Sequence, residues 1–335
     1  MKQNRKSHII PILIILLIFS SFATSIVYFT NYTRNTDKSE LDISKHYVAV
    51  IAKSTTSAFW KSVRAGTNAA STEYNLTMTF EGPENEVDYE EQNTLIHQAV
   101  KNGAKAIVFS ASDFNGNAQA INDAARQGVK IVVIDSDVNS NLVSCRISTD
   151  NYRAGYMAGR ASLTAKEDSI NIGIVNFEKN SANGQQREEG FRDAVALDQR
   201  AKIVDAVNAN STTEAAQSET IKMLKEHPEI NVITALNEWT SLGAGNAIAQ
   251  LKLEEQTTVV AFDSNIISVG MLETGEVDAL IVQDPFAMGY LGVECAYNLI
   301  QGIEPEAQTV DTATTLVTRD NMFEEGIQRI IFPFN

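Results

Sequence analysis

Polar and aromatic side chains gather directly after the predicted strands of this 335-residue chain. They occur in six short segments: Ser54–Trp60, Ser110–Asp113, Asp135–Asp137, Asn237–Ser241, Phe262–Ser264 and Gln283–Pro285. Ligands of parallel α/β sheets bind beyond the carboxyl ends of the strands, so these segments are the candidate ligand contacts. Their carboxylates and amides offer paired hydrogen-bond acceptors or donors, which suits the recognition of a polar small molecule.

Catalytic chemistry would need a nucleophile with a base, paired carboxylates in a closed site, or a metal cluster. The four histidines show no triad or zinc-ligand spacing; they are His8, His46, His97 and His227. The string GAGNAI at Gly243 lacks the third glycine of a dinucleotide-binding loop and begins inside a predicted helix. We therefore expect no enzymatic activity, no metal site and no cofactor.

The elements that would position these segments alternate between strand and helix. Apolar runs typical of buried strands begin at Tyr47, Lys105, Val129, Ile170, Asn231, Thr258 and Asp278. Between them, apolar residues recur at helical spacing over Glu90–Asn102, Asn115–Gln127, Gly184–Leu197, Thr213–Glu226 and Leu242–Leu251. Repeated strand–helix–strand units predict parallel sheets with helices on both faces.

This pattern occurs twice, first from Tyr47 to about Ile147 and again from Ile170 to about Phe262. The predicted fold class is therefore α/β, with two doubly wound parallel-sheet lobes joined by a hinge and a ligand cleft between them. We assign residues 46–150 plus about 281–308 to an N-terminal lobe, and residues 151–280 plus about 309–335 to a C-terminal lobe.

Charge is distributed unevenly along the chain. Residues 1–36 contain four basic side chains and no acid, so they carry +4 of the net −15 and leave −19 for the rest. This acidic balance argues against a nucleic-acid partner, because phosphates are bound by clustered Lys and Arg. Only two cysteines are present, Cys145 in a strand-like alternation and Cys295 in a helical pattern. Buried free thiols are the preferred interpretation, and a disulfide between them is the alternative.

Residues 9–29 contain no charge and, as a helix, would span roughly 30 Å, about the thickness of a bilayer's hydrocarbon core. An uncleaved transmembrane anchor is the preferred interpretation, and a cleaved secretory signal ending near Ser21 and Ala23 is the alternative. Residues 1–8 would then be a cytoplasmic stub and residues 30–45 a tether. We expect the binding domain to be extracytoplasmic and held at the cell membrane by a single pass.

The strand-end segments, in this order and spacing, resemble those of the type 1 periplasmic binding proteins. The resemblance is to the ribose-binding-like branch, which serves sugar ABC transporters and shares its core with the lac-repressor group. It covers about Tyr47 to Val317 and includes QQREEGF at Gln185–Phe191 and STDNYRAGYMAG at Ser148–Gly159. A repressor of this group would need a basic DNA-binding headpiece, and the hydrophobic segment stands in its place.

The resemblance implies a monosaccharide site that both lobes form. Phe59 and Trp60 match an aromatic pair that stacks on the apolar faces of the sugar ring. The family's hydrogen-bonding contacts to sugar hydroxyls correspond to Asp135 in the first lobe and to Asn237, Asp263 and Gln283 in the second.

Three positions depart from the ribose-binding pattern. Ser136 follows the first-lobe aspartate where the family has an arginine, Gln185 replaces a second ligand-binding arginine, and Asn210–Ser211 replaces an aromatic ring. Trp239 is the candidate replacement for that ring. These changes disfavour ribose and make xylose the preferred guess among pentoses and hexoses, with Gln185 and Trp239 as further ligand contacts.

Structural roles remain open for several of these residues. Phe59 and Trp60 could be ordinary core, and Asp135 and Asp263 could cap helices. Arg187 is assigned a structural role because it lies one turn into its helix.

Two membrane partners fit such a receptor. An ABC permease would accept the sugar for transport, which is the preferred function. The extracytoplasmic domain of a histidine kinase, in a two-component system, would instead read the closed state as a signal. Tethering would raise the receptor's effective concentration at either partner.

Overall fold

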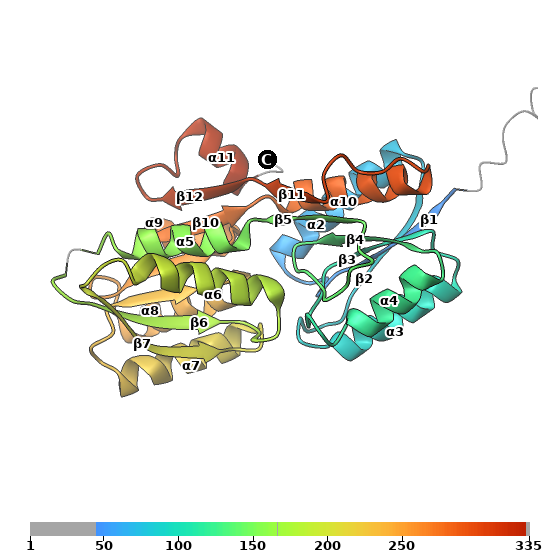
Figure 1. Ribbon diagram of the computed structural model, residues 1–335. Helices are drawn as coiled ribbons and strands as arrows, with labels where there is room; N and C mark the ends of the chain where they lie inside the picture. The colour runs from blue at the N-terminus through green and yellow to red at the C-terminus, as the bar shows by residue number, and fades with distance from the viewer. Residues whose placement is uncertain (1–44, 166, 333–335) are drawn as a thin grey trace, which may run out of the picture. The chain divides into compact units, whose positions relative to one another are not determined.

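A computed structural model describes residues 45–165 and 167–332 of the chain (Figure 1). The predicted cytoplasmic stub, the transmembrane anchor or signal, and all of the tether except Lys45 lie outside the described residues. Among the residues that are described, no helix is both long and apolar enough to cross a bilayer.

The first lobe is built on a six-stranded sheet with the order β11-β5-β4-β3-β1-β2, in which each neighbouring pair is parallel. Its strands are β1 (Tyr47–Ile51), β2 (Thr77–Glu81), β3 (Ala106–Phe109), β4 (Lys130–Ile134), β5 (Cys145–Thr149) and β11 (Thr309–Thr312). Helices α2 (Ala58–Glu73) and α10 (Pro285–Ile300) pack on one face, and α3 (Tyr89–Lys101) and α4 (Ala118–Arg126) on the other.

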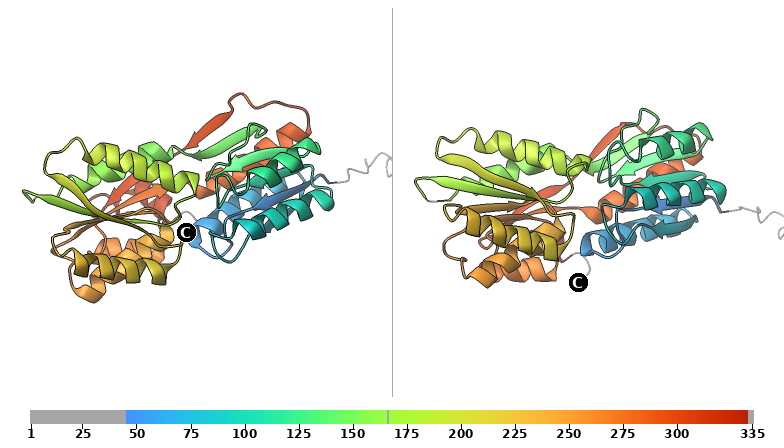
Figure 2. Two further views of the ribbon diagram at one scale, coloured as in Figure 1. Left: turned by 60° about the horizontal axis from the view of Figure 1, so that its bottom comes forward. Right: turned by 90° about the horizontal axis from the view of Figure 1, so that it is seen from below.

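The second lobe repeats this arrangement with the order β12-β10-β9-β8-β6-β7. Its strands are β6 (Ile170–Asn176), β7 (Ala201–Asn208), β8 (Val232–Ala235), β9 (Thr258–Phe262), β10 (Ala279–Gln283) and β12 (Thr314–Thr318). Helices α5 (Asn151–Ser162) and α6 (Ala182–Val195) cover one face. The other face carries α7 (Thr213–Glu226), α8 (Glu238–Leu251), α9 (Ile266–Thr274) and α11 (Glu325–Ile331). Two further views in Figure 2 show the same layering.

Burial on both faces explains why the central strands are continuous apolar runs. In β3 and β8 each residue is buried, and β1, β4 and β9 are buried from their second residue onward. The predicted parallel α/β lobes are confirmed, with one exception: β12 runs antiparallel to β10. The edge strands β2 and β7 contain no buried residue, and they lack the continuous apolar runs by which the central strands were recognised.

Three chain segments connect the lobes: Asp150 between β5 and α5, Asp284 between β10 and α10, and Ala313 between β11 and β12. The lobe boundaries in the structure differ by a few residues from the predicted ones. Strand β10, which ends at Gln283, belongs to the second sheet although residues from about 281 were assigned to the first lobe. Strand β11 belongs to the first sheet although residues from about 309 were assigned to the second lobe.

Close packing of α5 against α6 positions one side of the cleft between the lobes. A Cβ atom at Gly155 would lie 1.9 Å from the carbonyl oxygen of Arg187, and one at Gly190 would lie 2.0 Å from that of Tyr152. Glycine is therefore required at both positions for the two backbones to approach this closely. This contact brings Asn151, at the start of α5, within hydrogen-bonding distance of the Arg187 guanidinium.

Candidate ligand-binding site

A small cleft lies where the carboxyl ends of the strands of both lobes meet. In the described conformation its volume is about 20 Å³, enough for roughly one water molecule. The side chains that line it come from both lobes: Lys53, Ser57, Phe59, Trp60, Glu86, Asp135, Phe177, Asn183, Arg187, Asn237, Glu238, Asp263 and Gln283.

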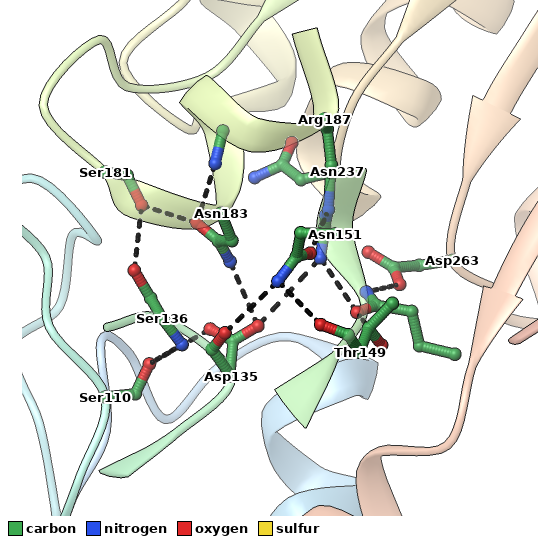
Figure 3. Close-up of polar contacts among 12 residues, drawn as sticks. Ser110, Asp135, Ser136, Thr149, Asn151, Ser181, Asn183, Arg187, Asn237 and Asp263 are labelled. Carbon is green, nitrogen blue, oxygen red and sulfur yellow. Dashed lines mark hydrogen bonds and ion pairs between the residues drawn. The ribbon is translucent and has the colours of Figure 1, made fainter. Parts of the chain in front are cut away.

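Arg187 makes polar contacts with several residues around this cleft (Figure 3). Its guanidinium donates hydrogen bonds of 2.8 Å to the Asn151 side chain, to the Leu236 carbonyl and to Oε1 of Gln283. It lies 4.0 Å from an oxygen of Asp135. Burial lowers the pKa of Arg187, and the nearby carboxylates, above all Asp263, act in the opposite direction. The guanidinium therefore fixes the walls of the cleft and partly neutralises its carboxylates.

Asp135 and Asp263 occupy equivalent places in the two lobes. Each directly follows a strand, has a positive φ (57° and 68°), and donates its backbone N–H to the next parallel strand, at Ile147 and Ile281 respectively. Positive φ is unfavourable for a non-glycine residue and is found mostly where function or surroundings demand it. Neither aspartate caps a helix; the N-cap of α9 is Asn265. The open alternative of helix capping is thus not what the structure shows.

The carboxyl group of Asp263 is unusually basic for an aspartate. Burial raises its pKa to about 7, although Arg187 and a 2.6 Å hydrogen bond from Gln283 act to lower it. Asp135 instead accepts hydrogen bonds from Ser110 and Asn183, both at 3.0 Å. The two carboxyl groups therefore face the cleft in different electrostatic environments.

The aromatic pair Phe59-Trp60 opens helix α2, whose N-cap is Ser57. The rings meet edge to face, with centroids 5.1 Å apart, and both line the cleft. The indole Nε1 of Trp60 donates a 2.7 Å hydrogen bond to Glu86, a buried residue in the loop between β2 and α3. Phe59 and Trp60 also belong to the core of the first lobe, so the pair packs in that core and forms part of the cleft wall.

Glu86 joins the two lobes. Its second carboxylate oxygen accepts a 2.9 Å hydrogen bond from the Ser211 hydroxyl and a longer one, 3.4 Å, from the Asn237 amide. Asn237 is itself the N-cap of α8, where a capping box with Thr240 fixes its side chain. A carboxylate of the first lobe thus contacts donors of the second lobe inside the cleft.

Glu238 makes the reciprocal connection from the second lobe. Its carboxylate accepts hydrogen bonds from the backbone N–H groups of Ala58 and Phe59, at 3.1 and 2.9 Å, and from the Asn265 amide at 2.9 Å.

Lys53 of the first lobe also contacts the second lobe. Its ammonium group donates to the Ser181 hydroxyl at 3.0 Å and lies 4.9 Å from the centre of the Phe177 ring.

A second and larger hollow, of about 650 Å³, adjoins the segments that connect the lobes. It shares Phe59, Asp263 and Gln283 with the cleft, but much of its remaining lining is apolar and includes Ile266 and Phe332. The polar groups of both lobes converge in the smaller cleft, so we place the candidate ligand site there.

Six of the eight predicted ligand contacts line the cleft together: Phe59, Trp60, Asp135, Asn237, Asp263 and Gln283. The structure places Gln185 elsewhere. This side chain is exposed, and its amide donates to the carbonyl of Lys179. Trp239 is half buried and does not line the cleft; its neighbour Glu238 does. Gln185 and Trp239 lie outside the cleft for the same reason. Consecutive helix residues point about 100° apart, so a nearby residue of the same helix faces the cleft instead.

The sequence did not single out three polar residues of the cleft, which are Lys53, Glu86 and Asn183. Glu238 lies in the candidate segment Asn237–Ser241, although Asn237 and Trp239 were the contacts named there. Glu86 follows β2, so the rule of strand carboxyl ends would have found it had that edge strand been recognised. Asn183 and Arg187 lie four residues apart on α6 and share the face that borders the cleft. Arg187, expected to be structural, makes hydrogen bonds within the second lobe and also lines the cleft.

This arrangement provides aromatic faces beside carboxylates and amides that can bind a ligand from two sides. Within residues 45–165 and 167–332, no cluster of three or more His, Cys, Asp or Glu side chains could hold a metal ion. The geometry suits non-covalent recognition of a small polar molecule.

Comparison with known proteins places the chain in a family. Residues 48–304 match the family model of the periplasmic binding protein domain. The D-ribose/D-allose-binding protein of Pseudomonas aeruginosa is 25% identical over 285 residues, covering 82% of this chain and 89% of that protein.

Two solved structures are also similar. A carbohydrate transporter solute-binding protein of Agrobacterium radiobacter, in complex with D-arabinose, has 29% identity, a TM-score of 0.83 and coverage of 87% of this chain and 100% of its own. A chain of the XylFII-LytSN complex has 26% identity, a TM-score of 0.76 and coverage of 82% and 98%. The family match over most of the chain, together with two lobes of the same strand order, shows that this chain belongs to the periplasmic binding proteins, in the ribose-binding-like branch of type 1.

Proposed function

We propose that this chain is an extracytoplasmic monosaccharide-binding protein that closes on a pentose or hexose and delivers it to an ABC transporter. The observation that carries the proposal is the convergence, in one cleft, of an aromatic pair from the first lobe with carboxylates and amides from both lobes. Sugar rings combine apolar C–H faces with hydroxyl groups, so they match aromatic planes and planar hydrogen-bonding groups at the same time.

A ligand bound there would favour closure because it contacts both lobes. In the described conformation Asn183 donates to Asp135 and Ser211 donates to Glu86 across the cleft. A sugar that enters would separate these pairs and replace them with its own hydroxyls. Its affinity for the closed state then exceeds its affinity for the open state, which is the condition for ligand-driven closure.

The charges of the cleft favour a neutral sugar over an acidic one. Four carboxyl groups line it, from Glu86, Asp135, Glu238 and Asp263, against two cationic groups, from Lys53 and Arg187. A sugar acid or sugar phosphate would bring a further negative charge into a buried site that already carries an excess of them. We therefore expect affinity for uncharged pentoses or hexoses.

Xylose is the first sugar to test, because the ribose-binding pattern is altered at Ser136 and Ser211. In the structure Ser136 contacts Ser181 of the second lobe, and Ser211 contacts Glu86, so both positions belong to the polar wall around the cleft. Ribose and allose, named for the Pseudomonas relative, and D-arabinose, bound in the Agrobacterium structure, complete the set for comparison.

Sensing is a second candidate function, and the similarity to a chain of the XylFII-LytSN complex favours it. In this alternative the closed, sugar-bound state is recognised by the extracytoplasmic domain of a membrane histidine kinase. The predicted single-pass anchor at residues 9–29 would keep the receptor beside such a partner.

Calorimetry tests the binding function. The chain from Asp42 onward contains the whole compact unit His46–Asn335 and should bind at least one neutral monosaccharide. Asp263→Ala should abolish the heat of binding without unfolding the protein, whereas Asp320→Ala, at an exposed position, should leave it unchanged. No heat with xylose, ribose, allose, arabinose or glucose would refute the sugar assignment. Co-purification of the full-length chain from membranes then separates the two roles: a permease partner supports transport and a kinase supports sensing.

A further inference from the structure

The hollow beside the connections between the lobes is far larger than the cleft and has no role in the proposed function. Its volume of about 650 Å³ lies in the range of small-molecule sites, whereas the cleft measures about 20 Å³. The hollow reaches into the protein, because its lining includes the buried residues Val282, Gln283 and Ile331. Two exposed residues, Ile266 and Ile330, also line it. It therefore combines depth with apolar surface, as ligand pockets do.

One polar group of this hollow lacks a partner. The hydroxyl of Ser62, on α2, is buried and makes no hydrogen bond within the part of the chain that the structure describes. Buried hydroxyls are nearly always paired, and each exception needs an explanation. A molecule in the hollow that presents a hydrogen-bonding atom to Ser62 would provide the missing partner.

The charged side chains of the hollow are already paired. Asp284 accepts a 2.9 Å hydrogen bond from a backbone N–H at the start of α10, and Arg329 forms an ion pair with Glu325. Asp263 accepts a 2.6 Å hydrogen bond from a side-chain amide of β10. A charged ligand would lose its hydration in a mainly apolar space without gaining a free counter-charge. These features select an uncharged molecule with an apolar body and at least one hydrogen-bonding group.

Both lobes and the segments between them form the hollow. The first lobe contributes Ser62 and the start of α2, and the second contributes Ile266 and the end of α11. Asp284 and Ala313, which are two of the three connections, also line it. A molecule bound there would stabilise the present arrangement of the lobes. In this arrangement the cleft has room for only about one water molecule, so it cannot hold a sugar.

We propose that this hollow is a second binding site, which takes an uncharged, mainly apolar small molecule and, when occupied, weakens sugar binding in the cleft. The effect on the sugar rests on the proposed function, whereas the site itself does not. The two ligands favour different arrangements of the lobes, so each lowers the affinity of the other by the same factor. Phe59, Asp263 and Gln283 line both spaces, which adds a direct route for this competition.

Benzophenone is a suitable probe because it is uncharged and apolar, and its one carbonyl group can accept a hydrogen bond from Ser62. On irradiation it adds to nearby C–H bonds, so labelled peptides gain its mass. The full-length chain in membranes should be irradiated with increasing amounts of benzophenone, and its peptides should be mapped by mass spectrometry. We expect saturable labelling of the peptides that contain Ile266 or Ile330.

Two variants test whether the label enters the hollow. Ile330→Asp should reduce labelling roughly fivefold, because it adds a charge to the lining, and residue 330 is exposed enough to tolerate the change. Ile303→Asp is the matched control, since Ile303 is also exposed but does not line the hollow. Ser62→Ala removes only the hydroxyl and should reduce labelling about threefold. Equal labelling of the wild type and Ile330→Asp, or labelling that does not saturate, overturns the site.

The sugar provides the test of coupling. A saturating concentration of a sugar that binds the cleft should lower benzophenone labelling about fivefold, a usual size for coupling between two sites. Labelling that the sugar leaves unchanged contradicts the coupling. Labelling of the purified chain but not of the chain in membranes would show that a membrane partner covers the hollow, and would overturn the small-molecule assignment. If no sugar binds while saturable labelling remains, the proposed function fails and the coupling with it, but the site stands.

Discussion

The carboxylate of Glu238, in the second lobe, accepts a 2.9 Å hydrogen bond from the backbone N–H of Phe59 in the first lobe. The neighbouring N–H of Ala58 donates to the same carboxylate at 3.1 Å. These groups form the first turn of α2, where unpaired N–H groups and the helix dipole favour a negative charge. One lobe thus caps a helix of the other.

Replacing Glu238 should weaken closure. Glu238→Gln keeps an acceptor oxygen but removes the charge, so sugar affinity should fall roughly tenfold, the size expected for losing a charge-assisted contact at a helix terminus. Calorimetry measures the affinity, and small-angle scattering of the sugar-free protein should show a larger radius of gyration. Glu255→Gln, at an exposed position, is the control. An unchanged affinity and radius for Glu238→Gln would show that the cap does not contribute to closure.

Titration of Asp263 should make stability depend on pH. Its pKa is about 7 in the folded state, well above the ordinary value of 3.8. The folded protein therefore keeps a proton that the unfolded chain releases above about pH 4. The associated stabilisation is complete below about pH 4, falls as pH rises, and is lost above about pH 7.

The Asp263→Asn variant has no titratable group at this position. Its comparison with the wild type therefore isolates the contribution of Asp263 to the pH dependence of stability. Free energies of unfolding from urea titrations at several pH values should show that the wild type loses stability relative to the variant between about pH 4 and 7. The other acidic groups are common to both proteins and cancel in the difference. A wild-type minus variant difference that is independent of pH would contradict a raised pKa for Asp263.

Glu86 should matter for stability as well as for binding. Glu86→Ala leaves the indole N–H of Trp60 and the hydroxyl of Ser211 without their acceptor, which should cost about 1–3 kcal/mol in the free energy of unfolding. Glu86→Gln retains an acceptor oxygen and should cost less. Glu84→Ala, exposed in the same loop, is the matched control. Equal stability of all three variants in urea would mean that Glu86 is not needed to satisfy these buried donors.

Arg187 and Gln185 provide a test on a single helix. Arg187→Ala leaves Asp135 and Asp263 without their buried counter-charge, and breaking such a group typically destabilises by about 3–5 kcal/mol. Gln185→Ala should change the free energy of unfolding by less than about 0.5 kcal/mol, because the side chain is exposed. Sugar affinity should be lost in the first variant and kept within twofold in the second. A large loss of affinity for Gln185→Ala would restore it as a ligand contact.

The fold could be predicted because its central strands are buried on both faces. Runs such as YVAVI in β1 and TVVAF in β9 have no solvated face, and the helices between them show clear periodicity. The edge strands β2 and β7 could not be recognised in this way, since none of their residues is buried and polar residues interrupt their apolar ones. Missing β2 also meant missing Glu86, which follows it.

The residues that line the cleft could be predicted from the sequence near strand ends, and less well on helices. Asp135 and Asp263 directly follow β4 and β9, and Gln283 ends β10, so the sheet determines where these residues lie. Gln185 and Trp239 lie on α6 and α8, where an error of one residue turns a side chain away from the cleft. The packing of α6 on α5 and on the second sheet determines which of its faces borders the cleft.

The order of assembly follows from the way the first lobe is completed. Its sheet receives its last strand, β11, and one of its covering helices, α10, from residues 285–312, after the whole of the segment from α5 to β10. Domains generally fold as units and in the order in which the chain emerges. Both lobes therefore stay incomplete until nearly the entire chain has been synthesised, because the second lobe in turn receives β12 and α11 from residues 314–331. Until α10 is available, α2 is the only one of the two helices on that face of the first sheet that the chain has supplied.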